Sequence, residues 1–342
     1  MVASHYNPSE EQKAIWIYLE QESGVLENVS LELLAKGRQM ADQMEWRLIG
    51  LILGNKTGDL VDQAFTHGAD EIRVADHPLL ENYTIDAYAR LVYQAILVAK
   101  PSVFLLGATP NGRDLAGRLA VRLRTGLNAD CTGLRLEPES GVLVSEVSGF
   151  GGGVLALIEM RSHRPQMATV RPGVFEVSPP NYDPTGETIH IPIDLTEDMI
   201  HTRVVEKVSG EQVDLSRAAL LVAGGRGVEG NFKLLGNLAN LLDGEVGATR
   251  PPVDEGHIQR ERQIGQTGVV CSPKVAICCG ISGAFHFVVG VEKAETVIAI
   301  NTDPAAPIFE FADYNVVGDV HEIVPALIEA IRERKNSSET NL

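Results

Sequence analysis

Glycine and small hydroxyl residues gather in three short segments of the last third of the chain. Residues 223–227 read Ala-Gly-Gly-Arg-Gly, residues 264–268 read Ile-Gly-Gln-Thr-Gly, and residues 280–284 read Gly-Ile-Ser-Gly-Ala. Glycine lets backbone N–H groups approach a phosphate closely, and a helix that starts behind such a loop adds a favourable dipole. The amide and hydroxyl of the second segment can hydrogen-bond the polar edge of a planar heterocycle. Each segment alone is also compatible with an ordinary turn, but together they favour a bound dinucleotide.

The elements around these segments alternate between strand and helix. Apolar runs predict strands at residues 218–223, within 269–280, at 296–300 and at 316–319, and helices are predicted over residues 231–242 and 321–334. Two of the glycine-rich segments directly follow a predicted strand. Because open α/β sheets bind ligands beyond the carboxyl ends of their strands, this half of the chain is predicted to be a Rossmann-like binding domain.

The first half of the chain shows the same alternation. Strands are predicted at residues 14–20, 46–54, 71–75 and 102–107, and helices at 30–35, with Ser30 as N-cap, and at 59–68, 84–100 and 112–124. Strands separated by such helices indicate a mostly parallel sheet with right-handed crossovers. Short strands without helices follow at 132–136, 142–147, 154–160 and 166–170, and they favour an antiparallel extension of that sheet. One more strand is predicted at 188–193.

The length of 342 residues predicts two domains, because one domain usually has about 100 to 200 residues. Residues 196–215 have weak periodicity and many charges, so the junction is predicted there. We therefore expect an α/β protein with an N-terminal nucleotide-binding-like domain at residues 1–205. A C-terminal Rossmann-like domain at residues 206–335 and a tail at residues 336–342 complete the predicted organisation.

Composition disfavours several classes of partner. The formal net charge of −17, without a long Lys/Arg run, disfavours nucleic acid and anionic lipid. No apolar run reaches the roughly 20 residues of a membrane helix, and residues 1–13 lack the layout of a signal peptide, so no membrane insertion and a cytoplasmic location are expected. Cys131, Cys271, Cys278 and Cys279 form no C-x-x-C pair and the histidines are scattered, so we expect no metal site. Because neighbours on a strand face opposite sides, Cys278 and Cys279 are expected as buried thiols on its two faces.

Longer segments carry a family resemblance. In the second half they are residues 247–251 (Gly-Ala-Thr-Arg-Pro), 265–268 (Gly-Gln-Thr-Gly), 280–284, 299–309 (Ala-Ile-Asn-Thr-Asp-Pro-Ala-Ala-Pro-Ile-Phe) and 312–314 (Ala-Asp-Tyr). In the first half they are residues 33–38 (Leu-Leu-Ala-Lys-Gly-Arg), 107–114 (Gly-Ala-Thr-Pro-Asn-Gly-Arg-Asp) and 164–172 (Arg-Pro-Gln-Met-Ala-Thr-Val-Arg-Pro). In their order, spacing and residue identities these segments closely resemble the α-subunits of electron transfer flavoproteins, and the resemblance covers almost the whole chain.

The resemblance implies an FAD held mainly by the C-terminal domain and a smaller β-subunit packed on the N-terminal domain. The residues that match the family's FAD site are Arg226, Thr249, Arg250, Ile264, Gly265, Gln266, Thr267, Ser282, Gly283, Ala284, Phe285, His286, Phe287, Asn301, Asp319 and Val320. In this interpretation Arg250 lies beside the isoalloxazine, where reduction adds negative charge. Gln266, Thr267 and Ser282 supply hydrogen bonds to the ring edge or the phosphates.

Some positions leave alternatives open. Asn301 and Asp319 suit the adenosine or ribityl hydroxyls, but Asp319 can instead cap the last helix. The family commonly reads Ser-Gly-Ala-Ile-Gln-His where residues 282–287 read Ser-Gly-Ala-Phe-His-Phe. The family's His, which donates to the flavin near its O2, is aligned with Phe287, and His286 occupies the preceding Gln position. Either the contact is lost and the redox potentials differ from those of typical relatives, or His286 takes the contact over.

The implied function is that of an electron carrier without catalytic residues rather than a stand-alone enzyme. Typical electron donors in the family are acyl-CoA dehydrogenases or NADH, and typical acceptors are quinone-linked or ferredoxin-linked oxidoreductases. The expected partners are thus the β-subunit, in a heterodimer, and redox proteins of these classes. Some relatives bifurcate electrons with a second FAD in the β-subunit and others hold AMP there, and the sequence leaves both open.

An NAD-dependent dehydrogenase is the main alternative, because G-x-G-x-x-G is formally present at residues 225–230. Such an enzyme needs an acidic residue about 20 positions later, for which Asp243 and Glu245 are the candidates, and a catalytic His or Lys. The sequence shows no convincing catalytic set. A regulatory nucleotide-binding module without redox chemistry is the third interpretation, because the first half resembles generic nucleotide-binding sheets.

Overall fold

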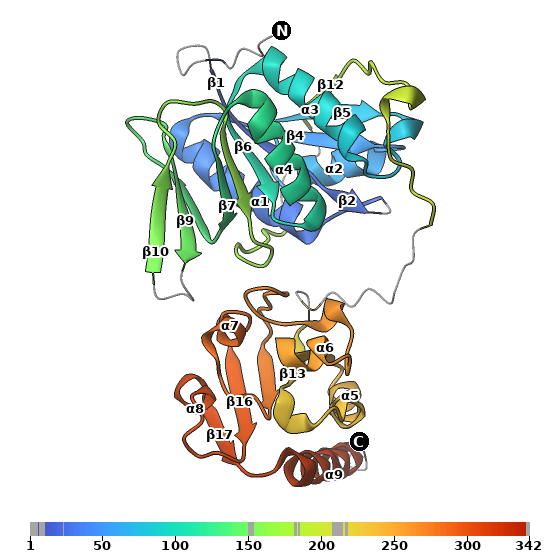
Figure 1. The fold of residues 1–342 in the computed structure, drawn as a ribbon, viewed down its shortest axis with the longest axis vertical. Helices are drawn as coiled ribbons and strands as arrows, with labels where there is room; N and C mark the ends of the chain where they lie inside the picture. Colours follow the sequence, from blue (N-terminus) through green and yellow to red (C-terminus); the bar gives the residue numbers. More distant parts are fainter. Residues whose placement is uncertain are drawn as a thin grey trace. The chain divides into compact units, whose positions relative to one another are not determined.

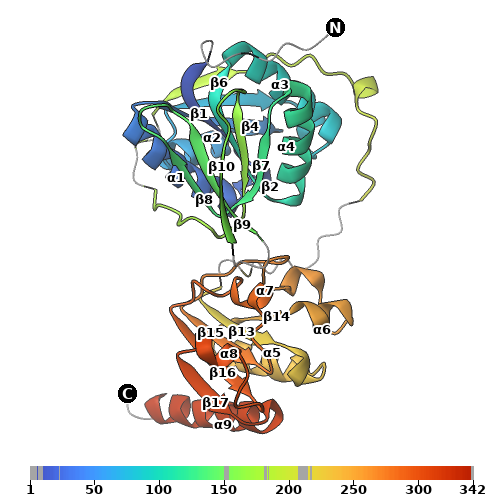
Figure 2. The same cartoon turned by 60° about the vertical axis from the view of Figure 1, so that its left-hand side comes forward.

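The computed structural model describes residues 6, 11–22, 24–149, 154–180, 183, 185–206, 215 and 218–339. The chain divides into two units, Met1–Lys207 and Val208–Leu342 (Figures 1 and 2). Each unit is built on its own parallel sheet with helices packed against it. The prediction of an α/β protein with mostly parallel sheets is therefore confirmed.

A seven-stranded sheet forms the centre of the first unit, in the order β12-β5-β4-β1-β6-β11-β7, and all neighbouring strands are parallel. Its strands are β1 (Gln12–Tyr18), β4 (Arg47–Gly54), β5 (Glu71–Asp76), β6 (Pro101–Gly107), β7 (Leu127–Cys131), β11 (Gln166–Val170) and β12 (Glu187–His190). The helices α1 (Asn28–Met44), α2 (Gly58–Thr66), α3 (Ile85–Ala99) and α4 (Pro110–Leu123) connect successive strands. This alternation agrees with the one predicted.

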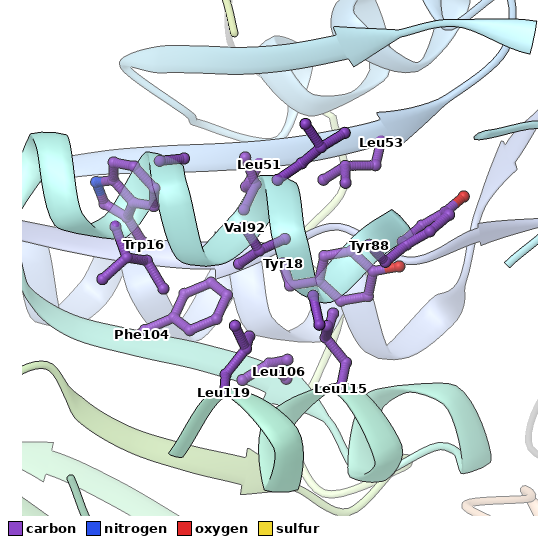
Figure 3. Close-up of a cluster of buried hydrophobic side chains, with 14 of the residues drawn as sticks. Trp16, Tyr18, Leu51, Leu53, Tyr88, Val92, Phe104, Leu106, Leu115 and Leu119 are labelled. Carbon is purple, nitrogen blue, oxygen red and sulfur yellow. The ribbon is translucent and has the colours of Figure 1, made fainter. Parts of the chain in front are cut away.

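Strand β1 shows why this sheet has a core on each face. Successive side chains of a strand point to opposite faces, so Ile15 and Ile17 pack in the core that includes residues of α1, whereas Trp16 and Tyr18 pack in the other. Figure 3 shows this second core, in which Trp16 and Tyr18 lie among side chains of β4, β6, α3 and α4. Burial on both faces explains the continuous apolar run in the sequence.

The region between β7 and β11 differs from the predicted antiparallel extension. Strands β8 (Gly133–Leu136), β9 (Leu143–Gly149) and β10 (Val154–Glu159) form a separate three-stranded antiparallel sheet. Strand β11 is parallel to its neighbours and lies between β6 and β7 in the main sheet. All of its residues are buried, as in an inner parallel strand, so the expected antiparallel extension was wrong.

The start of α1 also differs from the prediction. After β1, a hairpin of β2 (Gln21–Glu22) and β3 (Val25–Leu26) leads to the helix, which begins at Asn28 with Glu27 at the N-cap position. Ser30 lies inside the first turn, and its hydroxyl donates to the Glu20 carbonyl oxygen at 3.0 Å. The prediction of Ser30 as N-cap was wrong, because the helix begins two residues earlier. The Ser30 hydroxyl bonds to the segment after β1 and does not accept from the first N–H groups of the helix.

Glu20 occupies the point of the first sheet where the strand order reverses. The strands β4 and β5 continue the sheet on one side of β1, and β6 lies on its other side. Glu20 follows β1, is 7% exposed, and accepts hydrogen bonds from Thr109 Oγ1 at 2.5 Å and Asn111 Nδ2 at 3.1 Å. Both donors belong to the start of α4, so a carboxylate of the chain itself lies at this helix N-terminus.

The second unit contains a five-stranded parallel sheet in the order β14-β13-β15-β16-β17. Its strands are β13 (Leu220–Gly224), β14 (Glu245–Ala248), β15 (Val275–Cys279), β16 (Thr296–Asn301) and β17 (Tyr314–Val317). Its α-helices are α5 (Phe232–Leu241), α6 (Arg250–Asp254), α7 (Phe285–Val288), α8 (Ile308–Phe311) and α9 (Val320–Glu339). Helix α9 runs beyond the predicted end at Arg334, so residues 336–339, expected in the tail, are helical.

Strand β15 carries a core on each face of this sheet. Cys278 packs with Ile281, Phe287 and Ile308, whereas Cys279 packs in a core that includes residues of α5 and α9. The expectation that these thiols are buried on opposite faces is therefore confirmed. Burial raises the pKa of the Cys278 thiol to about 12, so the unreactive thiol form persists at neutral pH.

Candidate functional site

The strand order of the second sheet determines where a ligand can bind. Counted along the chain, its strands lie in the order 2-1-3-4-5, so the chain continues from β13 to β14 on one side and then returns to β15 on the other. Loops that leave β13 and β15 therefore diverge. In doubly wound sheets the crevice at such a switch point, beyond the carboxyl ends of the strands, binds nucleotides. The glycine-rich loops at residues 225–227 and 280–284 begin there.

A cavity of about 890 Å³ lies at this edge of the sheet. Of the predicted site residues, the structure brings together Arg226, Thr249, Arg250, Ile264, Gln266, Thr267, Ser282, Ala284, His286, Phe287 and Asn301 in its wall. Gly265, Gly283, Phe285, Asp319 and Val320 are not part of the lining. The volume is in the usual range for a cofactor pocket, about 300 to 1,000 Å³.

The two glycine loops contact each other through their backbones. Gly227 N donates to Gly280 O at 3.1 Å, and a Cβ at position 227 would lie 2.8 Å from Gly280 Cα. A Cβ at position 225 would lie 2.3 Å from Gly280 O. Glycine is thus required at these positions for the contact between the loops, which forms the floor of the crevice.

Gln266 and Thr267 lie on a closed loop at residues 263–269. Ile264 N donates to Ala248 O at 2.8 Å, and Gly265 N donates to Val269 O at 3.0 Å. Gly265 has a φ of 128°, and a Cβ there would lie 2.3 Å from His286 O. Gly265 therefore shapes the loop from behind, although it does not line the cavity.

Gln263 opens this loop and was missing from the predicted site. Its side chain is buried, lines the cavity, and donates from Nε2 to Thr267 Oγ1 at 2.9 Å. Gly268 accommodates the Gln263 backbone, because a Cβ at position 268 would lie 2.2 Å from the Gln263 carbonyl oxygen. A single Gln ahead of an apolar residue has no pattern that distinguishes it from a surface residue, so the sequence offers no signal for it.

His286 and Phe287 have different surroundings. Phe287, the residue aligned with the family's His, is 4% exposed and packs in the apolar core beneath the loop. His286 is exposed, and its Nδ1 lies 2.6 Å from Gln266 Oε1, while Gln266 N donates to His286 O at 2.7 Å. Of the two side chains, His286 therefore presents the polar group to the cavity.

Two guanidinium groups give the cavity wall positive charge. Arg226 belongs to the turn after β13, and Arg250 begins α6 just beyond the end of β14. Arg250 Nε lies 3.0 Å from Asp254 Oδ2, one turn further along the helix, and Asp254 also lines the cavity. Arginine at such an edge suits an anionic ligand, because its planar fork can form paired hydrogen bonds with phosphate oxygens.

Of the three remaining predicted residues, Asn301 lines the cavity, whereas Asp319 and Val320 do not. Asn301 Nδ2 donates to Ile281 O at 2.9 Å, which ties the end of β16 to the loop after β15. Asp319 Oδ1 accepts from His321 N at 2.8 Å, so Asp319 has the helix-capping contact that the sequence left as an alternative. Val320 packs in the core shared by α5 and α9.

The geometry disfavours the NAD-dependent dehydrogenase. Its ribose-binding acid must lie near the carboxyl ends of the strands, where the ligand binds. Glu245 instead begins β14 at its amino end and pairs with Arg262 at 3.2 Å, and Asp243 precedes it in the chain. Both candidate acids are thus at the edge of the sheet opposite to the glycine loops.

Metal-binding groups and membrane-spanning helices are absent from the described part of the chain. There, no group of three or more His, Cys, Asp and Glu side chains is arranged to hold a metal ion. No helix of that part has the length and apolar character needed to cross a membrane. The wall of the cavity, with its glycine loops, amides, hydroxyls and arginines, fits a phosphate-containing organic cofactor.

Comparison with known proteins identifies this cofactor. The electron transfer flavoprotein domain matches residues 15–194, and the electron transfer flavoprotein FAD-binding domain matches residues 214–292, which include most of the cavity wall. The chain is 44% identical to Protein FixB of Clostridium saccharobutylicum, over 94% of this chain and 97% of that one. It is 42% identical to the electron transfer flavoprotein subunit alpha of Thermoanaerobacterium thermosaccharolyticum, over 94% of this chain and 99% of that one.

A third relative has a more specific name. The acryloyl-CoA reductase electron transfer subunit beta of Anaerotignum propionicum is 37% identical, over 94% of this chain and 96% of that one. All three relatives are matched along nearly their whole length, and the family models cover both units of the chain. The resemblance found in the sequence is confirmed, and the chain belongs to the electron transfer flavoprotein family, as an α-subunit with an FAD-binding domain.

Proposed function

We propose that this chain is the FAD-carrying subunit of a heterodimer that shuttles electrons between redox proteins. The observation that supports it is the place of the cavity, at the switch point of the sheet and inside the domain described as FAD-binding. Bound FAD would supply all of the redox chemistry. The chain's own residues bind the cofactor, orient it and adjust its potential, so none of them needs to be a nucleophile or a general base.

Different groups of lining residues suit different parts of FAD. The glycine loops after β13 and β15, with Arg226 and Ser282, suit the pyrophosphate, because they offer backbone N–H groups, a positive charge and a hydroxyl at one point. Arg250 at the start of α6 and the loop with Gln266 and Thr267 suit the isoalloxazine, whose edge carries donors and acceptors. Asn301 suits a ribityl or adenosine hydroxyl.

The proposed partner is a homologous β-subunit packed on the first unit. The relatives carry names of subunits, "alpha" in one and "electron transfer subunit beta" in another, and such names belong to assemblies. The first unit also exposes apolar side chains on an edge strand: Leu155 and Leu157 of β10 are each 57% exposed. Edge strands with apolar side chains are favourable sites of association.

The proposed redox partners are a CoA-linked dehydrogenase or NADH on one side, and a quinone-linked or ferredoxin-linked acceptor on the other. The name of the Anaerotignum relative, a subunit of acryloyl-CoA reductase, supports the CoA-linked class. Whether the complex bifurcates electrons depends on the β-subunit. Nucleotide analysis of the purified heterodimer decides this, since two FAD per heterodimer support bifurcation and one FAD with AMP contradicts it.

The absorption spectrum of the purified heterodimer tests the central proposal. We expect a yellow protein with a flavin spectrum that is bleached anaerobically by a donor system, either an acyl-CoA dehydrogenase with its substrate or NADH. A colourless protein that binds NAD and oxidises a substrate would instead support the dehydrogenase. A colourless protein that binds a nucleotide without redox activity would support the regulatory module.

A further inference from the structure

Gln263 is a polar side chain held rigidly in the cavity wall. It is 5% exposed, and its backbone is bonded on several sides: its N–H donates to Arg260 O at 3.0 Å, and its carbonyl oxygen accepts from Val269 N at 2.7 Å. It also forms a β-bridge with Ala248, the last residue of β14. This backbone is thus fixed to the sheet, and the bond from Nε2 to Thr267 Oγ1 orients the side chain.

The amide of Gln263 determines what the neighbouring hydroxyl can do. Gln263 Nε2 donates to Thr267 Oγ1 at 2.9 Å, and an amide nitrogen can only donate. The Thr267 oxygen is therefore the acceptor in this pair, and the hydroxyl proton is left for another acceptor. Thr267 is exposed and lines the cavity, so its proton is free to be donated to solvent or to a group bound there.

We propose that Gln263 is a positioning residue that orients the Thr267 hydroxyl as a donor to the bound isoalloxazine, an inference that rests on the proposed function. Reduction adds electron density to the ring and strengthens its acceptors. A donor already aimed at the ring stabilises the reduced form more than the oxidised form, and needs no reorganisation when the electron arrives. Gln263 thereby raises the midpoint potential without contacting the flavin.

The experiment measures the midpoint potential of FAD in the heterodimer, and its dissociation constant by titration of the apoprotein. Gln263→Met keeps the length of the side chain and removes the donor, so the hydroxyl is free to rotate. We expect its potential to fall by the equivalent of a tenfold change in the reduction equilibrium, which is about 59 mV for a one-electron couple. Thr267→Val should lower the potential likewise, and Thr267→Ser should retain it.

A double variant and a matched control test whether Gln263 changes the potential only through the Thr267 hydroxyl. Gln263→Met combined with Thr267→Val should have the potential of Thr267→Val alone, since Gln263 acts only through the hydroxyl. Gln259→Met makes the same exchange at an exposed position outside the cavity wall and should change nothing. If Gln263→Met does not retain FAD, Gln263→Leu serves instead, because it also removes the donor without adding a charge, and it should lower the potential likewise.

The sign of the change distinguishes the outcomes. A higher potential in Gln263→Met would overturn the proposal, because it would show that the amide oxygen had been occupying the Thr267 proton. An unchanged potential in a flavinated Gln263→Met protein, or additive effects in the double variant, would overturn it as well. In these cases the wild-type protein still carries FAD, whereas a wild-type heterodimer without flavin would contradict the proposed function itself.

Discussion

The charge balance beside the cavity depends on Arg250 and its neighbour Asp254. The pair is exposed on both sides, so solvent screens the attraction between the guanidinium and the carboxylate. Its Nε is occupied by the Asp254 carboxylate, which leaves the terminal nitrogens available to a ligand. Asp254, in the same helix, thus orients the guanidinium group of Arg250.

Replacing Arg250 by Ala should lower the midpoint potential of bound FAD, because the reduced ring loses a nearby positive charge. A charge-assisted hydrogen bond of about 1.5 to 3 kcal/mol corresponds to roughly 60 to 130 mV for a one-electron couple. A redox titration of the heterodimer measures the change. Arg260→Ala, at an exposed position outside the cavity wall, is the control, and equal potentials in both variants would remove Arg250 from the flavin site.

His286 and Phe287 should respond differently to substitution. His286→Ala removes the imidazole that contacts Gln266, so we expect a lower FAD potential with little change in stability. Phe287→His places an imidazole in an apolar core and should cost about 1 to 3 kcal/mol in the free energy of unfolding, measured with urea at saturating FAD. If Phe287→His instead raised the potential without loss of stability, position 287 would face the flavin directly.

At the scale of elements, the cavity depends on the backbone contact between the loops after β13 and β15, whose glycines line it. Gly227→Ala brings a Cβ against the backbone of Gly280, so we expect loss of stability and of FAD binding. Gly236→Ala is the matched control, because the same atom added there in α5 meets nothing within 4 Å. It should stabilise the protein by about 0.5 to 1 kcal/mol. Thermal unfolding and FAD titration measure both, and retained FAD affinity in Gly227→Ala would contradict the expected role of the contact.

The contact of Glu20, which follows β1, with the start of α4 should make the stability of the first unit depend on pH. Burial raises the pKa of Glu20, although hydrogen bonds from Thr109 and Asn111 lower it in part. The folded state therefore binds the proton more tightly than the unfolded state, so Glu20 should reduce stability as the pH rises above its usual pKa. Gln at this position can still accept from Asn111 and donate to Thr109.

Glu20→Gln should thus be more stable than the wild type at about pH 8, and the difference should shrink as the pH falls towards the usual pKa of a glutamate. Urea unfolding at several pH values measures it. A variant that is less stable at every pH would show that the negative charge itself is needed at the start of α4.

The sequence revealed those elements whose pattern is local. The apolar run of β1 and the periodicity of α3 predicted both correctly. Strand β7 was missed because Asn128 and Asp130 interrupt its pattern, and β14 because it is only four residues long. The pairing of β11 could not be predicted, since it depends on which distant strands flank it. Most of the cavity wall was predicted from a family resemblance, whereas Gln263 becomes recognisable only through its contact with Thr267.

At the scale of the whole molecule, the exposed apolar side chains of edge strand β10 should promote aggregation when the chain has no partner subunit. Expressed without a β-subunit, the chain should aggregate or lose FAD, and co-expression should yield a monodisperse heterodimer. Size-exclusion chromatography with light scattering and the flavin content per chain measure both. Replacing Leu155 and Leu157 by Ser should weaken the heterodimer, and a stable, fully flavinated wild-type monomer would contradict the proposed assembly.

The carboxylate of Glu20 also bears on how many cofactors one polypeptide can carry. Both units have a sheet with a switch point, but in the first unit the start of α4 already holds an anion that belongs to the chain. A phosphate arriving there would meet a like charge and would find the Thr109 and Asn111 donors occupied. We therefore expect a binding stoichiometry of one dinucleotide per chain, located in the second unit. Any further nucleotide found in the purified heterodimer should then stay with the β-subunit when the subunits are separated.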